Sequence, residues 1–161
     1  MTGASPRPSS CRTASPDTAG ENCQFEAEWL RNTGLFVGET IGGQSCFQPE
    51  KTVSRGEFLT MLVDTLRIPT ENTQTSALEQ QVPQLLRPYM AAALRSGLLN
   101  GLELDNLEMD APITGAEAAV MVQNALDLQV GADALEQVAA QEDGTPQWAA
   151  ASLTTLAYHG I

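Results

Sequence analysis

Few side chains in this sequence combine a reactive type with a spacing that chemistry requires. The only histidine, His159, has no nucleophile or carboxylate beside it in a recognisable motif, and Ser45-Cys46 has no base at a known catalytic spacing. We therefore predict a protein that is not an enzyme and that needs no cofactor. Among the scarce cations, Arg55 is the best candidate for a ligand contact, because a guanidinium can bind an acidic group through paired N–H donors.

The three cysteines leave two alternatives open. Cys11, Cys23 and Cys46 include no pair with a metal-ligand spacing such as C-x-x-C, so no metal site is predicted. Cys23 and Cys46 could form a disulfide in an extracellular protein, with Cys11 left in the N-terminal segment. Alternatively, all three are free thiols.

Charge and hydropathy exclude two classes of partner. The net charge of −12, from eight Lys+Arg against twenty Asp+Glu, argues against nucleic-acid binding. An anionic ligand would need a local basic site that overcomes this background. No apolar stretch approaches the ~20 residues of a membrane-spanning helix. Residues 1–22 are rich in Ser, Thr, Pro and Gly without the apolar centre of a signal peptide, and they predict a linker.

Glycines reveal an internal repeat. Gly34, Gly97 and Gly160 are spaced 63 residues apart, and each precedes Leu or Ile. A second set of pairs is spaced 60 residues apart: Val53 and Ile113, Glu57 and Glu117, Met61 and Met121, Leu66 and Leu126. Matched spacings over two segments predict a helix–loop–helix unit that occurs about two and a half times.

Local signals predict where the helices of each unit lie. Phe25 to Asn32 and Pro88 to Ser96 carry apolar residues at helical spacing, and each segment ends close to a glycine. Second helices are expected over residues 57–68 and 117–128, where apolar residues recur at i, i+3, i+4 and i+8. A further first helix is expected to begin near Pro146.

Both second helices open on a capping box. In Ser54-x-x-Glu57 and Thr114-x-x-Glu117, the hydroxyl is expected to accept from the third helical amide while the glutamate reaches back to the cap amide. Each cap contributes ~1 kcal/mol to its helix. These residues thus have a structural explanation, and position 55 is the one that the capping pattern does not determine.

In the order of these motifs, the chain resembles S-layer homology (SLH) repeats of bacterial cell-surface proteins. The resemblance covers residues 23 to 161. The first copy carries Gly34-Leu35, Gly38, Phe47-Gln48-Pro49 and Val53-Ser54-Arg55-Gly56-Glu57-Phe58. The second carries Gly97-Leu98, Gly101, Ile113-Thr114, Ala116-Glu117 and Met121. The third carries Trp148-Ala149 and Gly160-Ile161.

The resemblance implies an all-α fold, in which tandem SLH-like repeats form a pseudo-threefold pronged bundle with an incomplete third repeat. The expected divisions are a linker at 1–22, repeat one at 23–70, repeat two at 71–128 and a partial repeat three at 129–161. Within them, the Gln/Glu/Ala-rich segments 71–82 and 131–142 are each expected to add a short helix.

The resemblance also implies a function at the bacterial cell surface. Such modules anchor extracellular proteins non-covalently to a peptidoglycan-linked secondary cell-wall polymer, a carbohydrate that is often pyruvylated. The arginine of the Thr-Arg-Ala-Glu motif is a principal polymer contact, and Arg55 matches it. The candidate polymer-binding residues are Arg55, Ser54, Lys51, Arg31, Trp29 and Gly38. Lys51 and Arg31 could equally be solvated surface charges, and Trp29 could be a core or groove-wall anchor.

One departure from the family pattern supports a second hypothesis. Gly115 stands where the second copy should carry its arginine, so that copy has lost its key cation. The chain could therefore be a degenerate SLH-like helical scaffold for protein–protein contacts, self-association or domain spacing, without polymer binding.

Overall fold

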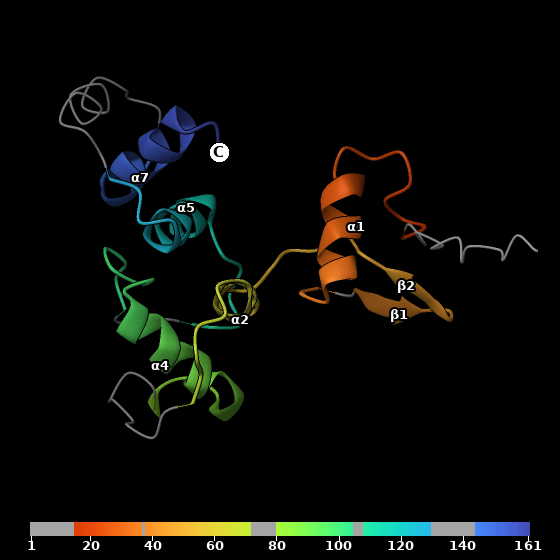
Figure 1. The fold of residues 1–161 in the computed structure, drawn as a ribbon, viewed down its shortest axis with the longest axis horizontal. Coiled ribbons are helices and arrows are strands. Elements are labelled where there is room, and N and C mark those ends of the chain that lie inside the picture. The colour runs from red at the N-terminus through yellow and green to blue at the C-terminus, as the bar shows by residue number, and fades with distance from the viewer. Residues whose placement is uncertain (1–14, 37, 72–79, 105–107, 130–143) are drawn as a thin grey trace, which may run out of the picture. The chain divides into compact units, whose positions relative to one another are not determined.

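The computed structural model describes residues 15–36, 38–71, 80–104, 108–129 and 144–161 (Figure 1). The chain forms two compact units, Met1–Lys51 and Thr52–Ile161, and each is described by itself. The division between them falls inside the segment 23–70 that the sequence assigns to the first repeat.

In the first unit a helix is followed by a hairpin. Helix α1 (Gln24–Thr33) ends at Gly34, whose φ of 74° lies in the left-handed region that glycine adopts without steric cost. Strand β1 (Glu39–Ile41) then pairs antiparallel with strand β2 (Gln44–Cys46). In the register of the hairpin, Glu39 lies opposite Cys46, Thr40 opposite Ser45 and Ile41 opposite Gln44.

The hairpin shows that the prediction of an all-α fold is wrong. Gly42 and Gly43 join the two strands with φ values of 58° and 82°. Two consecutive left-handed residues are typical of a type I′ turn, whose twist matches that of antiparallel strands. A segment interpreted as a glycine-containing loop therefore forms a small sheet, and the described fold is mixed: mainly helical, with one two-stranded sheet.

Turns precede α1 where composition predicts a linker. Ser15 and Thr18 are buried, and the Thr18 hydroxyl donates to the Ser15 carbonyl at 3.1 Å. The Gly20 amide donates to the Gln24 side chain at 2.8 Å, which links these turns to the helix. Residues 15–22 thus pack into the first unit.

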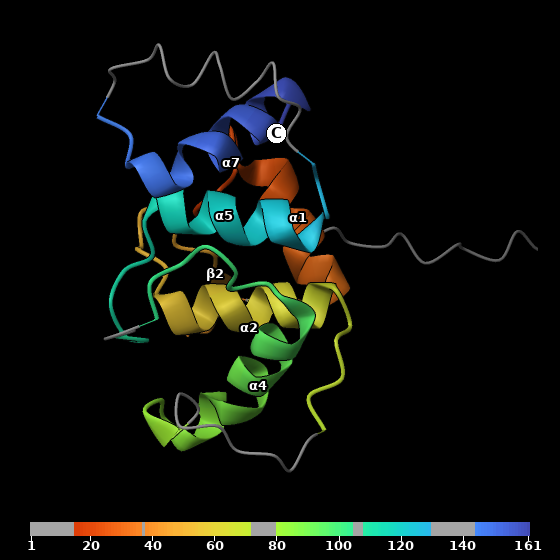
Figure 2. The ribbon, with the colours of Figure 1, turned by 90° about the vertical axis from the view of Figure 1, so that its left-hand side faces the viewer.

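The second unit contains four α-helices among its described residues and one short 3-10 helix. They are α2 (Arg55–Thr65), η1 (Gln84–Leu86), α4 (Arg87–Ser96), α5 (Gly115–Ala125) and α7 (Gln147–Tyr158). Helix α2 packs against α4, and α5 packs against α7 (Figure 2). In both pairs, the second helix of one sequence copy packs against the first helix of the next copy.

The core of the second unit follows from the apolar periodicity of these helices. Leu59 and Val63 of α2 lie one turn apart on one face and are fully buried. They belong to one buried cluster together with Val82, Met90, Ala92, Ala93, Leu98, Leu99, Met109 and Met121. Small residues on α4 allow α2 to approach closely, so Ala92 and Ala93 are also fully buried.

Three further sequence expectations have different outcomes. Cys23 and Cys46 are free thiols in the structure, so the disulfide alternative is not realised. None of the described helices is long and apolar enough to cross a membrane. The short helices expected at 71–82 and 131–142 fall mostly or wholly outside the described residues, as does Cys11.

Candidate functional site

The start of α2 lies at a seam between the two sequence copies. Its first two amides, those of Arg55 and Gly56, donate to the carbonyls of Ala111 and Met109, both at 2.9 Å. Ile113 returns a bond to the Val53 carbonyl at 2.9 Å. The loop that precedes α5 therefore runs antiparallel to the capping segment of α2, and it satisfies backbone donors that a helix N-terminus normally leaves unpaired.

Both predicted capping boxes are present in the structure. The Glu57 amide donates to the Ser54 hydroxyl at 3.2 Å, and the Ser54 amide donates to the Glu57 carboxylate at 2.8 Å. The Glu117 amide donates to the Thr114 hydroxyl at 3.2 Å, and the Thr114 amide donates to the Glu117 carboxylate at 2.9 Å. The Ser54 hydroxyl, which was a candidate polymer contact, is thus engaged in fixing the start of α2.

The side chain of Arg55 crosses the seam to the capping glutamate of the second copy. Its Nε lies 2.9 Å and its Nη2 2.8 Å from Oε1 of Glu117, and its Nη1 lies 3.3 Å from the Glu108 carbonyl. The two side chains of the ion pair retain only 20% and 15% of their exposure. Arg55 therefore joins the two copies, an interaction that local sequence patterns do not predict.

Glu117 consequently has two structural tasks. One carboxylate oxygen accepts from Arg55, while the other accepts from the Thr114 amide and from the Thr114 hydroxyl at 3.0 Å. Burial alone would raise the pKa of Glu117, but hydrogen bonds from Arg55 and Thr114, together with the charge of Arg55, outweigh it and lower the pKa. The carboxylate is therefore ionised at neutral pH and holds the guanidinium in place.

The matching position in the second copy is open. Gly115 is exposed, and a Cβ atom added to it would meet nothing within 4 Å. Among the described residues, the amides of Gly115 and Ala116 have no hydrogen-bond partner, in contrast to those of Arg55 and Gly56. A Cβ on Gly56 would lie 3.3 Å from the Met109 carbonyl oxygen across the seam and 2.7 Å from Leu86 Cδ1, so the first copy leaves little room at this position.

The other candidate residues belong to the first unit. Lys51 forms an ion pair with Glu39, whose carboxylate also accepts from the Gln48 amide group at 3.0 Å. Hydrogen bonds from Lys51 and Gln48 lower the pKa of Glu39. Arg31 lies in the last turn of α1, where a cation interacts favourably with the helix dipole. Lys51 and Arg31 therefore each have a structural explanation within the first unit.

Gly38, also a candidate polymer contact, has a steric role. Its φ is 74°, and an added Cβ would lie 2.2 Å from the Cys46 carbonyl oxygen. No side chain fits so close to the backbone of β2. Trp29 projects from α1 with 49% of its surface exposed, so it is not a core residue of the first unit.

Asp17 is an organising residue that the sequence interpretation missed. Its two carboxylate oxygens accept from the amides of Phe47 and Gln48, at 3.0 and 2.6 Å. These two bonds, that from Gln48 first, lower the pKa of Asp17. They also hold Gln48 at a left-handed φ of 58°. The one available signal was an aspartate in a turn-rich segment, a type that often bonds to backbone amides.

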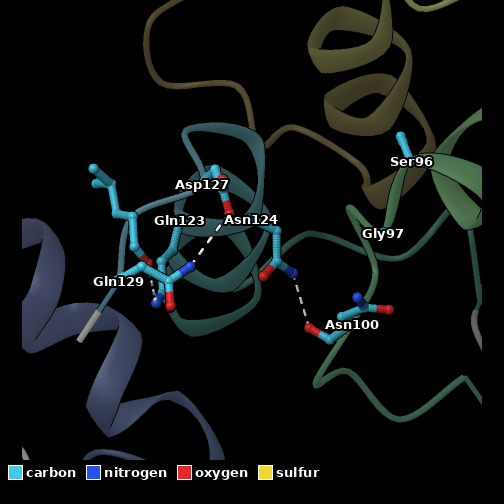
Figure 3. Close-up of a pocket in the computed structure, with 8 residues that line it drawn as sticks. Ser96, Gly97, Asn100, Gln123, Asn124, Asp127 and Gln129 are labelled. Atoms are coloured by element: carbon cyan, nitrogen blue, oxygen red, sulfur yellow. Dashed lines mark hydrogen bonds between the residues drawn. The ribbon is translucent and has the colours of Figure 1, made fainter. Parts of the chain in front are cut away.

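An open hollow of about 400 Å³ lies between the C-terminal ends of α4 and α5 (Figure 3). Its polar lining includes Asn100, Gln123, Asn124, Asp127 and Gln129, and none of the described lining residues is basic. Much of the lining is already bonded internally: the Asn124 amide donates to the carbonyls of Leu98 and Asn100, at 3.0 and 2.8 Å. The hollow therefore has few free donors for an anionic ligand.

Comparisons with known proteins add no family. No protein-family model matches the chain, and no curated protein matches it in sequence. The resemblance to SLH repeats thus depends on the repeated motifs alone, and any function derived from it is a proposal.

Proposed function

We propose that this protein is a non-catalytic module that anchors a surface protein to an acidic secondary cell-wall polymer in the extracellular wall of a bacterium. The proposal depends on the resemblance to SLH repeats. The observation that carries it is the place of Arg55, the residue that matches the family's polymer-binding arginine. It lies at a seam between two copies and keeps 20% of its side-chain surface exposed.

The remaining donors of Arg55 define how an acidic sugar would bind. Contacts at Nε, Nη2 and Nη1 engage one N–H on each nitrogen, so one N–H on each terminal nitrogen is left. A carboxylate on the polymer would accept from these two donors, with Glu117 holding the guanidinium in a fixed orientation. Because Glu117 is also negative, its repulsion limits the affinity of this single site.

A second candidate function is a scaffold that binds proteins or spaces domains without polymer binding. The observation that favours it is the ion pair itself, because Glu117 already neutralises Arg55. The scaffold function is also favoured by the glycine at position 115, where the family motif has arginine, and by the net charge of −12.

Cosedimentation with purified cell-wall sacculi separates the two candidates. The set comprises the wild type, Arg55→Ala, Glu117→Gln and, as the matched control, Arg95→Ala. Arg95 is an exposed cation on α4 whose contact is the Pro69 carbonyl at 2.8 Å. Circular dichroism verifies that each variant retains its helices.

Polymer anchoring through Arg55 predicts that Arg55→Ala loses binding and that Arg95→Ala retains it. Glu117→Gln should bind at least as well as the wild type, since removal of the carboxylate charge frees the guanidinium for the ligand. If the wild type does not bind sacculi, or if folded Arg55→Ala binds equally well, anchoring through Arg55 is wrong and the scaffold remains.

A further inference from the structure

The turn that follows α4 contains the one Asn-Gly pair of the sequence. Asn100 precedes Gly101, whereas each of the other asparagines precedes Cys, Thr, Leu or Ala. Glycine has no Cβ atom, so nothing screens its amide nitrogen from the side chain of the preceding residue. The amide nitrogen and the side-chain carbonyl carbon of Asn100 are also in the same chain, so they can react without an encounter between molecules.

Within the described part of the chain, neither reacting group is held by a hydrogen bond. The Leu102 amide donates to the Leu99 carbonyl at 3.2 Å, and Gly101 has a φ of 86°, as in a type II turn. The amide of Gly101 itself has no partner among the described residues. The side-chain amide of Asn100 is exposed and has none there either. It lies beside Gly97, where an added Cβ would be 2.9 Å from its Nδ2, so it must rotate before it reaches Gly101.

Two helical asparagines provide a comparison inside the same molecule. Asn32 lies in α1 before Thr33, and Asn124 lies in α5 before Ala125. The amides that follow them carry a Cβ on their residue and lie within a helix, where amides donate to carbonyls one turn earlier. Attack at these two positions requires a helix to open, whereas attack at Asn100 requires only a turn to open, which costs less.

We propose that Asn100 is a site of spontaneous covalent modification, in which the amide nitrogen of Gly101 attacks the side chain and ammonia is released. A bond forms between the Gly101 nitrogen and Cγ of Asn100, and the Cγ–Nδ2 bond breaks. The proton lost by the Gly101 amide leaves with the ammonia. Water then opens the cyclic imide that results. Addition of water at Cγ yields aspartate, and addition at the main-chain carbonyl carbon yields isoaspartate. Water is the only co-reactant.

The modification changes the polar hollow between the ends of α4 and α5 (Figure 3). The Asn100 carbonyl oxygen, which accepts from Asn124 at 2.8 Å, belongs to a free carboxylate in the isoaspartate product. The main chain of the turn also becomes longer by one carbon atom. Both products add a negative charge to a hollow that already contains Asp127, at the C-terminal ends of two helices, where the helix dipoles disfavour it. The modified chain should therefore be less stable than the original.

Peptide mapping of the whole chain after incubation at neutral pH tests the proposal. Trypsin and a glutamate-specific protease release residues 96–103, in which Asn100 is the only asparagine. The modified peptide gains the mass difference between O and NH, and its aspartate and isoaspartate forms separate by chromatography. Asn100→Gln is the matched control, because it keeps an amide but places the carbonyl carbon one bond further from the Gly101 nitrogen. The wild type in urea gives the rate without the fold.

In the native wild type, we expect Asn100 to be converted at least an order of magnitude faster than Asn32 and Asn124. The incubated wild type should then unfold at a lower urea concentration, while incubated Asn100→Gln keeps its midpoint. An Asn100 that stays intact in the native chain while the chain in urea is converted would overturn the proposal, since the fold would then prevent the attack. Equal conversion at Asn32 or Asn124 would also overturn it. Conversion with an unchanged midpoint would refute the effect on the hollow.

Discussion

The ion pair between Arg55 and Glu117 allows the seam between the copies to be measured directly. We expect the two residues to be coupled energetically in a double-mutant cycle made of Arg55→Met, Glu117→Gln and the double variant. Methionine keeps the apolar stem of the arginine. Glutamine also occurs at the third helical position of capping boxes, so it preserves the bond to the cap amide while it removes the charge.

The magnitude follows from the partial burial of the pair. Exposed pairs contribute ~0–1 kcal/mol, whereas removal of one partner from a fully buried pair costs ~3–5 kcal/mol. With side chains 20% and 15% exposed, and with two guanidinium nitrogens on one carboxylate oxygen, this pair lies between these limits. We expect a coupling free energy of about 1–3 kcal/mol.

Urea denaturation followed by Trp148 fluorescence provides the assay. A Trp29→Phe background makes Trp148 the only tryptophan, so that the signal reports the second unit alone. Midpoints should shift without a change in slope. A coupling free energy indistinguishable from zero, with all variants folded, would refute the assignment of Arg55 as the residue that joins the copies.

Acid should remove the same contribution. The pKa of Glu117 is lowered in the folded protein, so its stabilisation is fully present above the unfolded pKa of ~4.3 and is lost as the pH falls through the folded pKa. Below the folded pKa of Glu117, the free energy of unfolding of the wild type should therefore approach that of Glu117→Gln. A difference between the two proteins that persists unchanged in acid would contradict the electrostatic origin.

Four other substitutions test the packing and the turns. Gly38→Ala should destabilise the first unit by about 1–3 kcal/mol or more, because its Cβ would lie 2.2 Å from the Cys46 carbonyl oxygen; Trp29 fluorescence in urea measures it, and an unchanged midpoint would contradict the close approach. Gly115→Ala should stabilise the second unit by ~0.4–1 kcal/mol, whereas Gly56→Ala should destabilise it by ~1–3 kcal/mol. Calorimetry of the two variants should show opposite shifts in melting temperature. Shifts of the same sign would contradict the difference in packing between position 115 and position 56. Asp17→Asn should reduce the acid sensitivity of the first unit, to which Glu39 also contributes. The pKa of Asp17 is lowered, so its contribution is lost as the pH falls below ~3.9; a wild type and variant with equal acid midpoints would exclude the clamp on Phe47 and Gln48.

The helices were predictable because their end signals are local. A segment expected at Phe25 to Asn32 forms Gln24–Thr33, and one expected at Pro88 to Ser96 forms Arg87–Ser96. Their glycine C-caps lie within a few residues of the helix they end, as do the two capping boxes of the second helices. The hairpin has a weaker local signal. Gly42-Gly43 favours a two-residue turn, but the flanking Glu-Thr-Ile and Gln-Ser-Cys do not alternate between polar and apolar residues, so the segment resembles a loop in sequence.

The seam could not be predicted in the same way. Pairing between residues 53–56 and 109–113 depends on the position of a loop that is more than fifty residues away in sequence. Glu117 shows the difficulty most clearly, because its capping role explains the residue completely at the level of sequence. Only the tertiary structure shows that its second oxygen accepts from Arg55.

The same contact explains why the two copies differ at several positions together. Arg55 and Gly56 both pack against the loop that precedes α5. Gly56 has little room for a side chain, whereas the side chain of Arg55 reaches across to Glu117. In the second copy the equivalent positions are Ala116 and Gly115, whose amides have no loop carbonyl as partner among the described residues, and a Cβ added to Gly115 would meet nothing within 4 Å. In the described part of the chain, the contact that Arg55 makes across the seam therefore has no counterpart at Gly115. Introduction of arginine at position 115 would consequently restore a guanidinium without the glutamate that orients it.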